Sequence, residues 1–328
     1  MLRSTSLYLL VLLCCLSMPS AWADEAPADD SDSYFQVGVS TYIVDLPHYN
    51  PFWLRGAFLY APYEHAPSLT NDYAVAPRFE VTLGQRFADR WFGEFRGHYA
   101  ALNSQEDDDD YLSDRTLELG WFGIDGSQAS RGTINTIIID LTHSFRQLGG
   151  EFLLGRTYDL GSMDISPFGG VWVQYRSQEY ELDADMPASN DWIENTEEVG
   201  ALYLGPVVGL RLDYGFGGWS IGLETSHGLA LVHAWYDGTQ VYNGEQLFQE
   251  SSEEALAYKG ELSAEFSRQM GEHWKLGLTG GVEYLSYSPE VVASNLSTNE
   301  FGNGRQPAHV NGEYSLSGKL GLDLSYSF

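Results

Sequence analysis

The stretch Tyr314–Phe328 reads YSLSGKLGLDLSYSF and alternates between two kinds of side chain. Its even positions carry Tyr, Leu, Gly and Phe, whereas its odd positions carry Ser, Lys, Gly and Asp. Side chains of a β-strand point alternately to opposite faces, so the pattern predicts a strand with one apolar and one polar face. At about 3.3 Å per residue this strand would extend roughly 50 Å, which is enough to cross a tilted barrel wall.

The same alternation recurs upstream, and it predicts an all-β protein. We expect a transmembrane, antiparallel, up-and-down β-barrel, closed by the last strand with the C-terminal aromatic signature Tyr326 and Phe328. Both chain ends would lie in the periplasm, which requires an even number of strands. We predict about ten: 34–43, 74–87, 91–101, 133–158, 164–182, 198–214, 219–235, 255–269, 274–288 and 312–328.

The fourth of these segments leaves the strand count open. It is long for one strand, and Gly149-Gly150 interrupts its alternation. It is either one bulged strand or two strands, in which case Phe52–Tyr60 supplies another and the barrel has twelve.

The N-terminus has the pattern of an export signal. Arg3 precedes the apolar run Tyr8–Leu16, and Ala21-Trp22-Ala23 is a small-x-small cleavage site. We therefore predict a signal peptide at 1–23, an acidic periplasmic linker at 24–33 and the transmembrane barrel at 34–328. Both cysteines, Cys14 and Cys15, lie in the signal, so the mature chain can form no disulfide.

Composition and charge restrict the partners. The chain has 21 Tyr, 16 Phe, 9 Trp and 35 Gly, a composition suited to aromatic girdles and tight turns. The formal net charge of −29 repels nucleic acid, which we exclude as a partner. We expect a protein of the bacterial cell outer membrane, surrounded by lipid and lipopolysaccharide, inserted by the barrel-assembly machinery, and without a cofactor.

Short and long connections should alternate, as in barrels with short periplasmic turns and long outer loops. The predicted long segments are at about 44–72, 102–132, 183–197, 236–254 and 290–310. Acidic residues are frequent in them, for example in Glu106–Asp110, and they could bind divalent cations. Weak metal candidates are Asp107, Asp108, Asp109 and Asp110. A faint calcium-loop pattern at Asp183–Glu194 has Pro187 and Ala188 where such loops need other residues.

The register assigns both signs of charge to the lumen in nearly equal numbers. The predicted lumen-lining residues are Arg78, Glu80, Glu94, Arg96, Arg211, Asp213, Glu224, Lys259, Glu261, Lys275, Glu283, Lys319 and Asp323. Asp140 and Arg146 of the fourth segment are assigned to the same face. Such a lumen is either a salt-bridged plug, as in small barrels, or a narrow charged pore.

A surface hydrolase of the omptin type is a remote alternative, because such proteases are ten-stranded and act at the outer rim with Asp and His. His143-Ser144 and Ser226-His227 are adjacent in a strand and therefore point to opposite faces. His233 and Asp237 could meet at the rim, but we find no Asp-pair with an Asp-x-His arrangement. We therefore expect no catalytic residues and no enzyme.

Three stretches resemble the Legionella-type major outer membrane protein family. They are LGRTYDLG (154–161) with ISPFGGVW (165–172), LGPVVGLR (204–211) leading into GFGGW (215–219), and the final LGLDLSYSF. The resemblance implies a surface-exposed, porin-like barrel. We expect a passive, cation-preferring channel for small solutes, with a plugged structural or adhesion barrel acting through acidic outer loops as the alternative.

Overall fold

The computed structural model describes residues 33–46, 49, 52–56, 63–65, 73–87, 90–111, 117–121, 124, 137–186, 190–292, 295–299 and 302–328. The predicted signal peptide and all of the predicted linker except Ser33 lie outside these residues. No helix long and apolar enough to span a bilayer occurs in the described part of the chain.

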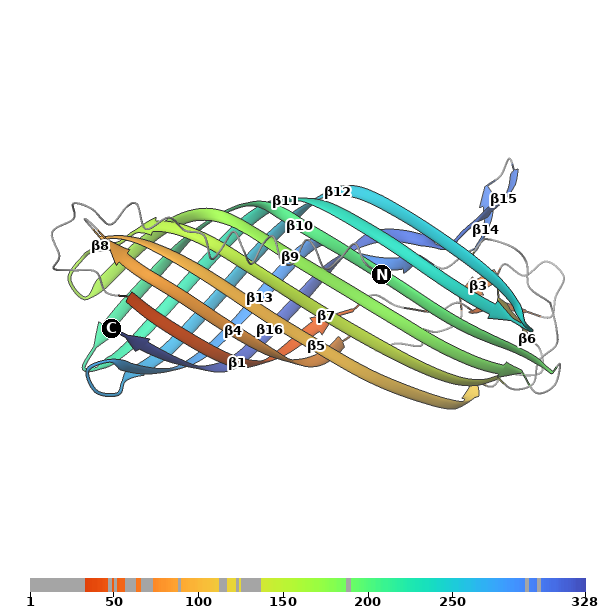
Figure 1. Ribbon diagram of the computed structural model, residues 1–328, viewed down its shortest axis with the longest axis horizontal. Helices are drawn as coiled ribbons and strands as arrows, with labels where there is room; N and C mark the ends of the chain where they lie inside the picture. The colour runs from red at the N-terminus through yellow and green to blue at the C-terminus, as the bar shows by residue number, and fades with distance from the viewer. Residues whose placement is uncertain are drawn as a thin grey trace.

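Ten long strands form one closed antiparallel barrel, in which each strand pairs with the next along the chain and the last pairs with the first (Figure 1). They are β1 (Ser33–Asp45), β4 (Tyr73–Phe87), β5 (Trp91–Tyr111), β7 (Ile137–Arg156), β9 (Met163–Met186), β10 (Asp191–Phe216), β11 (Trp219–Tyr242), β12 (Glu245–Gln269), β13 (Trp274–Val292) and β16 (His309–Ser327). The short β8 (Tyr158–Asp159) adds to the edge of β9 at the end where the C-terminus lies. The predicted ten-stranded barrel is confirmed.

The twelve-stranded alternative is wrong, because β7 is one continuous strand. It pairs with β9 from Ile138 to Gly155 without a register shift, and Gly149-Gly150 stays in the ladder. Gly149 leaves room for His98, whose ring a Cβ there would overlap.

The remaining short strands lie outside the barrel wall. The segment β2 (Phe52–Gly56) belongs to a separate three-stranded sheet with β3 (Tyr63–His65) and β6 (Leu117–Trp121). The strands β14 (Asn295–Asn299) and β15 (Gly302–Gln306) form a hairpin of their own between β13 and β16. The predicted extra strand at Phe52–Tyr60 therefore does not enter the barrel.

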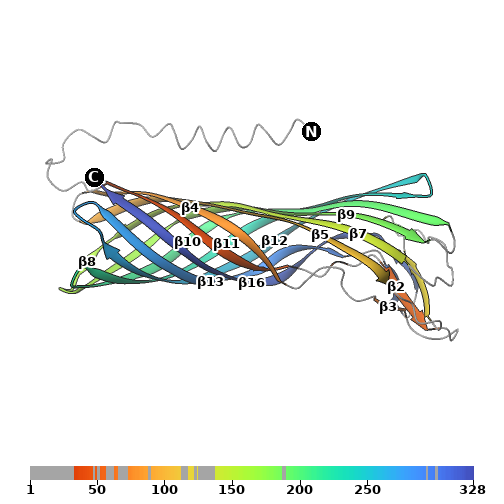
Figure 2. The same ribbon diagram turned by 90° about the horizontal axis from the view of Figure 1, so that it is seen from below.

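The strands are strongly tilted, as Figures 1 and 2 show. When the residue pairs are followed from strand to strand around the barrel, the row that starts at Tyr34 of β1 ends at Ser315 of β16. The hydroxyl of Ser315 lies 3.1 Å from the carbonyl oxygen of Asp45, which is again on β1. One circuit of the barrel therefore shifts the register on β1 by about twelve residues. For ten strands this shift corresponds to a strand tilt of about 40° from the barrel axis.

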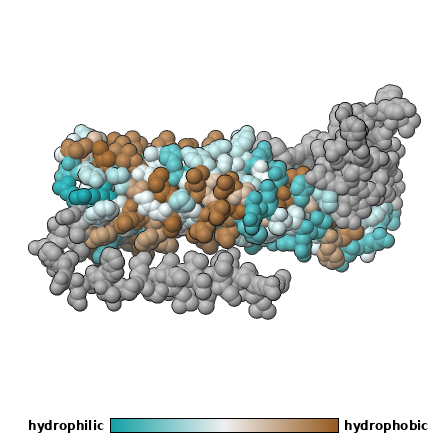
Figure 3. Space-filling model, turned by 90° about the horizontal axis from the view of Figure 1, so that it is seen from above, coloured by the Kyte–Doolittle hydropathy of each residue, from teal (hydrophilic) through white to brown (hydrophobic). Residues whose placement is uncertain are grey.

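The outward face carries an apolar belt. Leu229, Leu262, Leu278 and Leu320 are among its exposed side chains. Aromatic side chains border the belt at the turn end (Trp91, Trp274, Phe328) and at the other end (Tyr258, Tyr284, Tyr314). Figure 3 shows the belt in brown, with hydrophilic side chains beyond it. Such a belt is the surface that lipid requires.

Strands β7 and β9 to β12 continue far beyond this belt. A cross-strand row through Leu148, Tyr175, Leu202, His233 and Glu254 marks its upper boundary there. We call the strand segments above this row (137–147, 176–186, 191–201, 234–242 and 245–253) the outer extension. The 24 residues of β11 measure about 80 Å along the strand, roughly 60 Å along the barrel axis at this tilt, against about 25 Å of apolar band.

The predicted long loops at 183–197 and 236–254 are therefore largely wrong. They are hairpins, with β11 and β12 joined by a two-residue turn at Asn243 (φ 46°) and Gly244 (φ 89°). Asn-Gly is the sequence that favours this turn, because both residues tolerate positive φ. Short turns lie at the opposite end, where Gly217-Gly218 joins β10 to β11 and Met270–His273 joins β12 to β13.

Candidate functional site

The structure places the predicted lumen residues together inside the barrel. All of them except Glu283 line one cavity of about 520 Å³. The Glu283 carboxylate lies 3.9 Å from the Lys259 ammonium, at the inner end of this cavity. Asp140 and Arg146 were assigned to the wrong face: the odd residues of β7, such as Leu141 and Phe145, are buried inside, and the even ones point outward.

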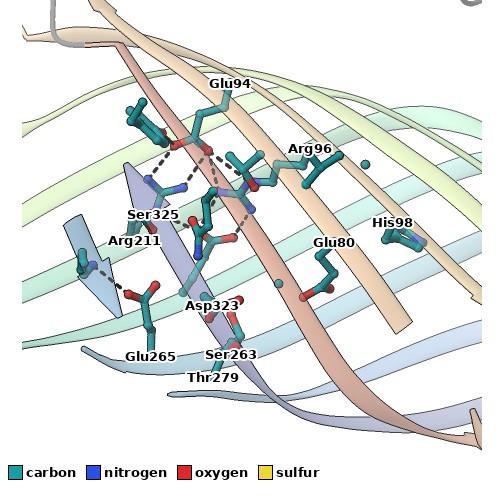
Figure 4. Close-up of a pocket in the computed structure, with 18 of the residues that line it drawn as sticks. Glu80, Glu94, Arg96, His98, Arg211, Ser263, Glu265, Thr279, Asp323 and Ser325 are labelled. Carbon is teal, nitrogen blue, oxygen red and sulfur yellow. Dashed lines mark hydrogen bonds and ion pairs between the residues drawn. The ribbon is translucent and has the colours of Figure 1, made fainter. Parts of the chain in front are cut away.

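Two arginines and two glutamates form the first charged layer of the lumen (Figure 4). Arg211 of β10 binds both carboxylate oxygens of Glu94 at 2.8 Å, and its Nε lies 2.9 Å from Glu224 of β11. Arg96 of β5 lies 2.8 Å from Glu94, which is only 1 % exposed. Bidentate guanidinium–carboxylate pairs are strong and directional, so this layer is rigid.

A second charged layer follows further from the turn end. Lys319 of β16 contacts Glu80 at 3.0 Å and Glu261 at 3.2 Å. Lys259 of β12 contacts Glu261 at 3.4 Å and Glu151 at 2.8 Å. Each cation is shared by two acids from different strands, so the layer links opposite parts of the wall.

An aromatic layer lies in the lumen above these charges. Trp172 and Tyr203 are 2 % and 0 % exposed, and their rings lie 5.8 Å apart. The Lys259 ammonium lies 5.4 Å from the Trp172 ring, which joins this layer to the charged one. Arg176 is 1 % exposed and stacks over Phe145, with the guanidinium carbon 5.1 Å from the ring centre. Among the described residues these side chains fill the lumen at the upper edge of the apolar belt.

A third group of buried side chains lies inside the outer extension. Tyr49 comes from the connection after β1 and stacks on Tyr180 at 4.2 Å, while His143 stacks on Tyr180 at 4.6 Å. Tyr49 and Tyr236 both donate hydrogen bonds to the buried carboxylate of Glu197. We call these five residues the outer cluster.

Burial is the largest cause of the pKa shifts of His143 and Glu197 in the outer cluster. It lowers the pKa of His143 to about 4, although the side chain of Gln178 opposes this shift. It also raises the pKa of Glu197, which accepts hydrogen bonds from tyrosines without a nearby cation among the described contacts. The cluster is therefore stable when His143 is neutral.

The sequence pattern missed several of these residues. Trp172 could have been found, because it occupies an inward, even position of β9. Glu197 was counted among loop acids because the strand β10 was expected to begin at 198. Tyr49 had no signal, because it stands in a connection without alternation.

The residues considered for catalysis do not meet. His143 is buried inside the barrel, and the neighbouring Ser144 faces outward. His233 and Asp237 both lie on the exposed outer face of β11, where the His233 ring lies 6.2 Å from that of Trp235. The ring of His227 is hydrogen-bonded to Tyr258 at 2.6 Å, also on the outer face.

Two candidate metal sites were expected from the sequence, the run Asp107–Asp110 and the segment Asp183–Glu194. Asp107, Asp108, Asp109 and Asp110 fall on the end of β5, and their side chains lie outside the described residues. The calcium-loop pattern at Asp183–Glu194 is a hairpin, in which Asp183 and Glu194 are paired across β9 and β10. Within the described ranges no group of three or more His, Cys, Asp or Glu is arranged to hold a metal ion.

A solved structure with the same fold comes from an outer membrane. The outer membrane protease OmpT from Escherichia coli matches with a TM-score of 0.52 and 7 % identity, over 93 % of this chain and 99 % of that one. The fold and the apolar belt together decide the location. This chain is a bacterial outer-membrane β-barrel.

Weaker matches add no argument about this barrel. A major outer membrane protein from Thermus thermophilus matches with a TM-score of 0.35 and 13 % identity, over 92 % of this chain and all of that chain. Neither a sequence model of a known family nor a curated protein sequence matches this barrel. Its likeness to the Legionella-type family stays a resemblance of three stretches.

The prediction that the chain is not an enzyme has to be corrected. One solved structure that matches over nearly the full length of both chains is a protease, so a barrel of this shape does not argue against enzymatic activity. At 7 % identity the likeness itself shows the fold alone.

Proposed function

We propose that this protein is a closed outer-membrane barrel that acts at the cell surface through its outer extension, with a lumen that does not conduct solutes. The observation that carries the proposal is the succession of lumen layers. Two layers of shared ion pairs are followed by the buried ring layer of Trp172 and Tyr203 and then by the outer cluster. Small barrels are commonly filled by their own side chains in this way.

The outer extension supports a surface role. The last nine of the 24 residues of β11 (234–242) stand above the apolar belt, so their outward side chains are presented to the lipopolysaccharide and to the medium. A strand needs about 9 to 11 residues to cross a membrane. The extra length therefore serves something other than spanning.

The outward face of the extension is acidic. One row of paired residues places Glu179, Glu198, Asp237 and Glu250 side by side on β9, β10, β11 and β12. Burial raises the pKa of Glu198, and the neighbouring charge of Glu179 adds to this. Like charges directly opposite one another in a sheet are destabilising. We propose that divalent cations relieve this repulsion diffusely and bridge the row to anionic lipopolysaccharide, as outer loops were expected to do.

A solute-flux measurement tests the closed lumen. Liposomes carrying the purified barrel should swell in isosmotic arabinose no faster than liposomes without protein. The triple variant Trp172→Ala, Arg176→Ala and Tyr203→Ala should increase the rate, because it removes the ring layer and the cation stacked within it. Rapid swelling with the unchanged protein would instead support the passive, cation-preferring channel.

A further inference from the structure

The lumen cavity is a vestibule that reaches the turn end of the barrel. Its lining extends from Lys259 and His98 deep inside to Gln269, His273 and Ser327 beside the turns. Short turns lie on the periplasmic side of such barrels. A small molecule in the periplasm could therefore enter the vestibule without crossing the closed layers.

Asp323 lies in the vestibule wall between two residues that have no side chain. It lies on β16 between Gly38 of β1 and Gly277 of β13, which are its paired residues on either side. A Cβ at Gly38 would overlap the Asp323 carboxylate. Gly38 thus makes room for the Asp323 carboxylate, whereas a Cβ at Gly277 would meet the side chain of Glu265.

The Asp323 carboxylate lacks a cationic partner in the described structure. Asp323 is 5 % exposed, and its Oδ2 atom has no hydrogen-bond partner among the described residues. The nearby lysines are engaged elsewhere: Lys275 contacts Glu265 at 2.7 Å, and Lys319 contacts Glu80 and Glu261. Leaving a buried carboxylate uncompensated is costly, so a ligand that supplies positive charge and N–H donors would be stabilised here.

The surrounding groups favour an organic cation over a metal ion. Ser263, Thr279 and Ser325 also line the vestibule, and Figure 4 draws them with Asp323 and Glu265. An ammonium donates up to three hydrogen bonds and is satisfied by one carboxylate and hydroxyl oxygens. Calcium would need six to eight oxygen ligands, and no cluster suited to a metal occurs among the described residues.

We propose that the periplasmic vestibule binds a small organic cation with a primary ammonium group, and that Asp323 is the residue that receives the ammonium. Glu265 lines the same wall, where it is paired with Lys275. The cavity of about 520 Å³ lies within the usual size of small-molecule sites and accommodates a linear diamine. This site is independent of the surface role proposed above.

Isothermal titration calorimetry tests the site, with the full-length mature barrel in detergent micelles and 1,5-diaminopentane as the probe. We expect saturable binding, at least tenfold weakening in Asp323→Asn, and no change in Glu272→Gln. Glu272 is a matched control because it is an exposed acid in the turn at the mouth of the vestibule. Uncharged 1,5-pentanediol should not bind.

The result that overturns the proposal is an absence of saturable binding to the folded protein, or equal binding by Asp323→Asn. Folding is monitored by the faster gel migration of unheated barrel. If Asp323→Asn fails to fold, Thr279→Val replaces it, and its affinity should fall severalfold because one hydroxyl acceptor of the vestibule wall is removed. Unchanged affinity in folded Thr279→Val would count against the assignment of this wall.

Discussion

His143 shows how a single buried side chain makes the outer cluster sensitive to pH. Its pKa is about 4 in the folded protein, against 6.5 for the free group. As pH falls, the unfolded chain therefore binds this proton first, and folding stability is lost between about pH 6.5 and pH 4. The loss should reach about 3 kcal/mol, at 1.36 kcal/mol per pKa unit.

The measurement is urea unfolding in lipid bicelles at pH 7 and pH 4.5, for the unchanged protein and for His143→Phe. Phenylalanine keeps a ring on Tyr180 and removes the titrating group. The variant should lose less stability between the two pH values than the unchanged protein. An identical pH dependence in both would show that His143 is not the group responsible.

Arg211 tests the first charged layer at the same scale. In Arg211→Met, the layer keeps the carboxylates of Glu94 and Glu224 with only the guanidinium of Arg96 between them, so the unfolding free energy should fall by about 3 to 5 kcal/mol. Adding Glu94→Gln should restore part of the loss, because it removes the uncompensated charge. Urea unfolding of both variants measures this, and a double variant less stable than the single one would contradict the argument.

At the scale of the strand, alternation predicted the inward and outward faces correctly where the strand faces lipid, and it failed where no lipid is present. The pattern assigned Lys319 and Asp323 to the inward face because lipid requires apolar side chains on every second residue of β16. Above the belt no lipid imposes this pattern, and both faces can be polar. Strand residues such as Glu198 and Asp237 were therefore expected at the ends of strands or in loops.

Some inward-facing residues and some contacts between strands could not be predicted from alternation. In β7, polar residues at Asp140 and Arg146 lie above the belt and were assigned inward. The lumen partners of Arg211 could not be predicted, because the pairing of side chains across the barrel depends on shear, which no single strand encodes. The position of Tyr49 depends on a connection without any periodicity.

The acidic row of the outer extension makes a prediction at this scale. Magnesium at millimolar concentration should raise the thermal unfolding temperature above its value in EDTA, because it reduces repulsion among the four carboxylates. The variant with Gln at positions 179, 198 and 250 and Asn at 237 should be stabilised without magnesium and respond less to it. Both proteins are measured in lipopolysaccharide-containing bicelles. If magnesium stabilises them equally, the acidic row is not the origin of the magnesium effect.

The molecule as a whole combines a lipid-facing barrel with a lumen that is packed with its own charged and aromatic side chains. The apolar belt fixes its place in the outer membrane, and the extension carries acidic strands above that membrane. The vestibule reaches the turn side, where Gln269, His273 and Ser327 belong to its lining. Both charged layers line this cavity, and the proposed cation site at Asp323 lies in it as well.

Single-channel recording in planar bilayers tests the closed lumen most directly. The unchanged protein, inserted in concentrated KCl and verified as folded by its gel migration, should give no stable conductance steps above the bilayer background. Discrete, long-lived and cation-selective steps that appear in proportion to the inserted protein would contradict the account and identify an open pore.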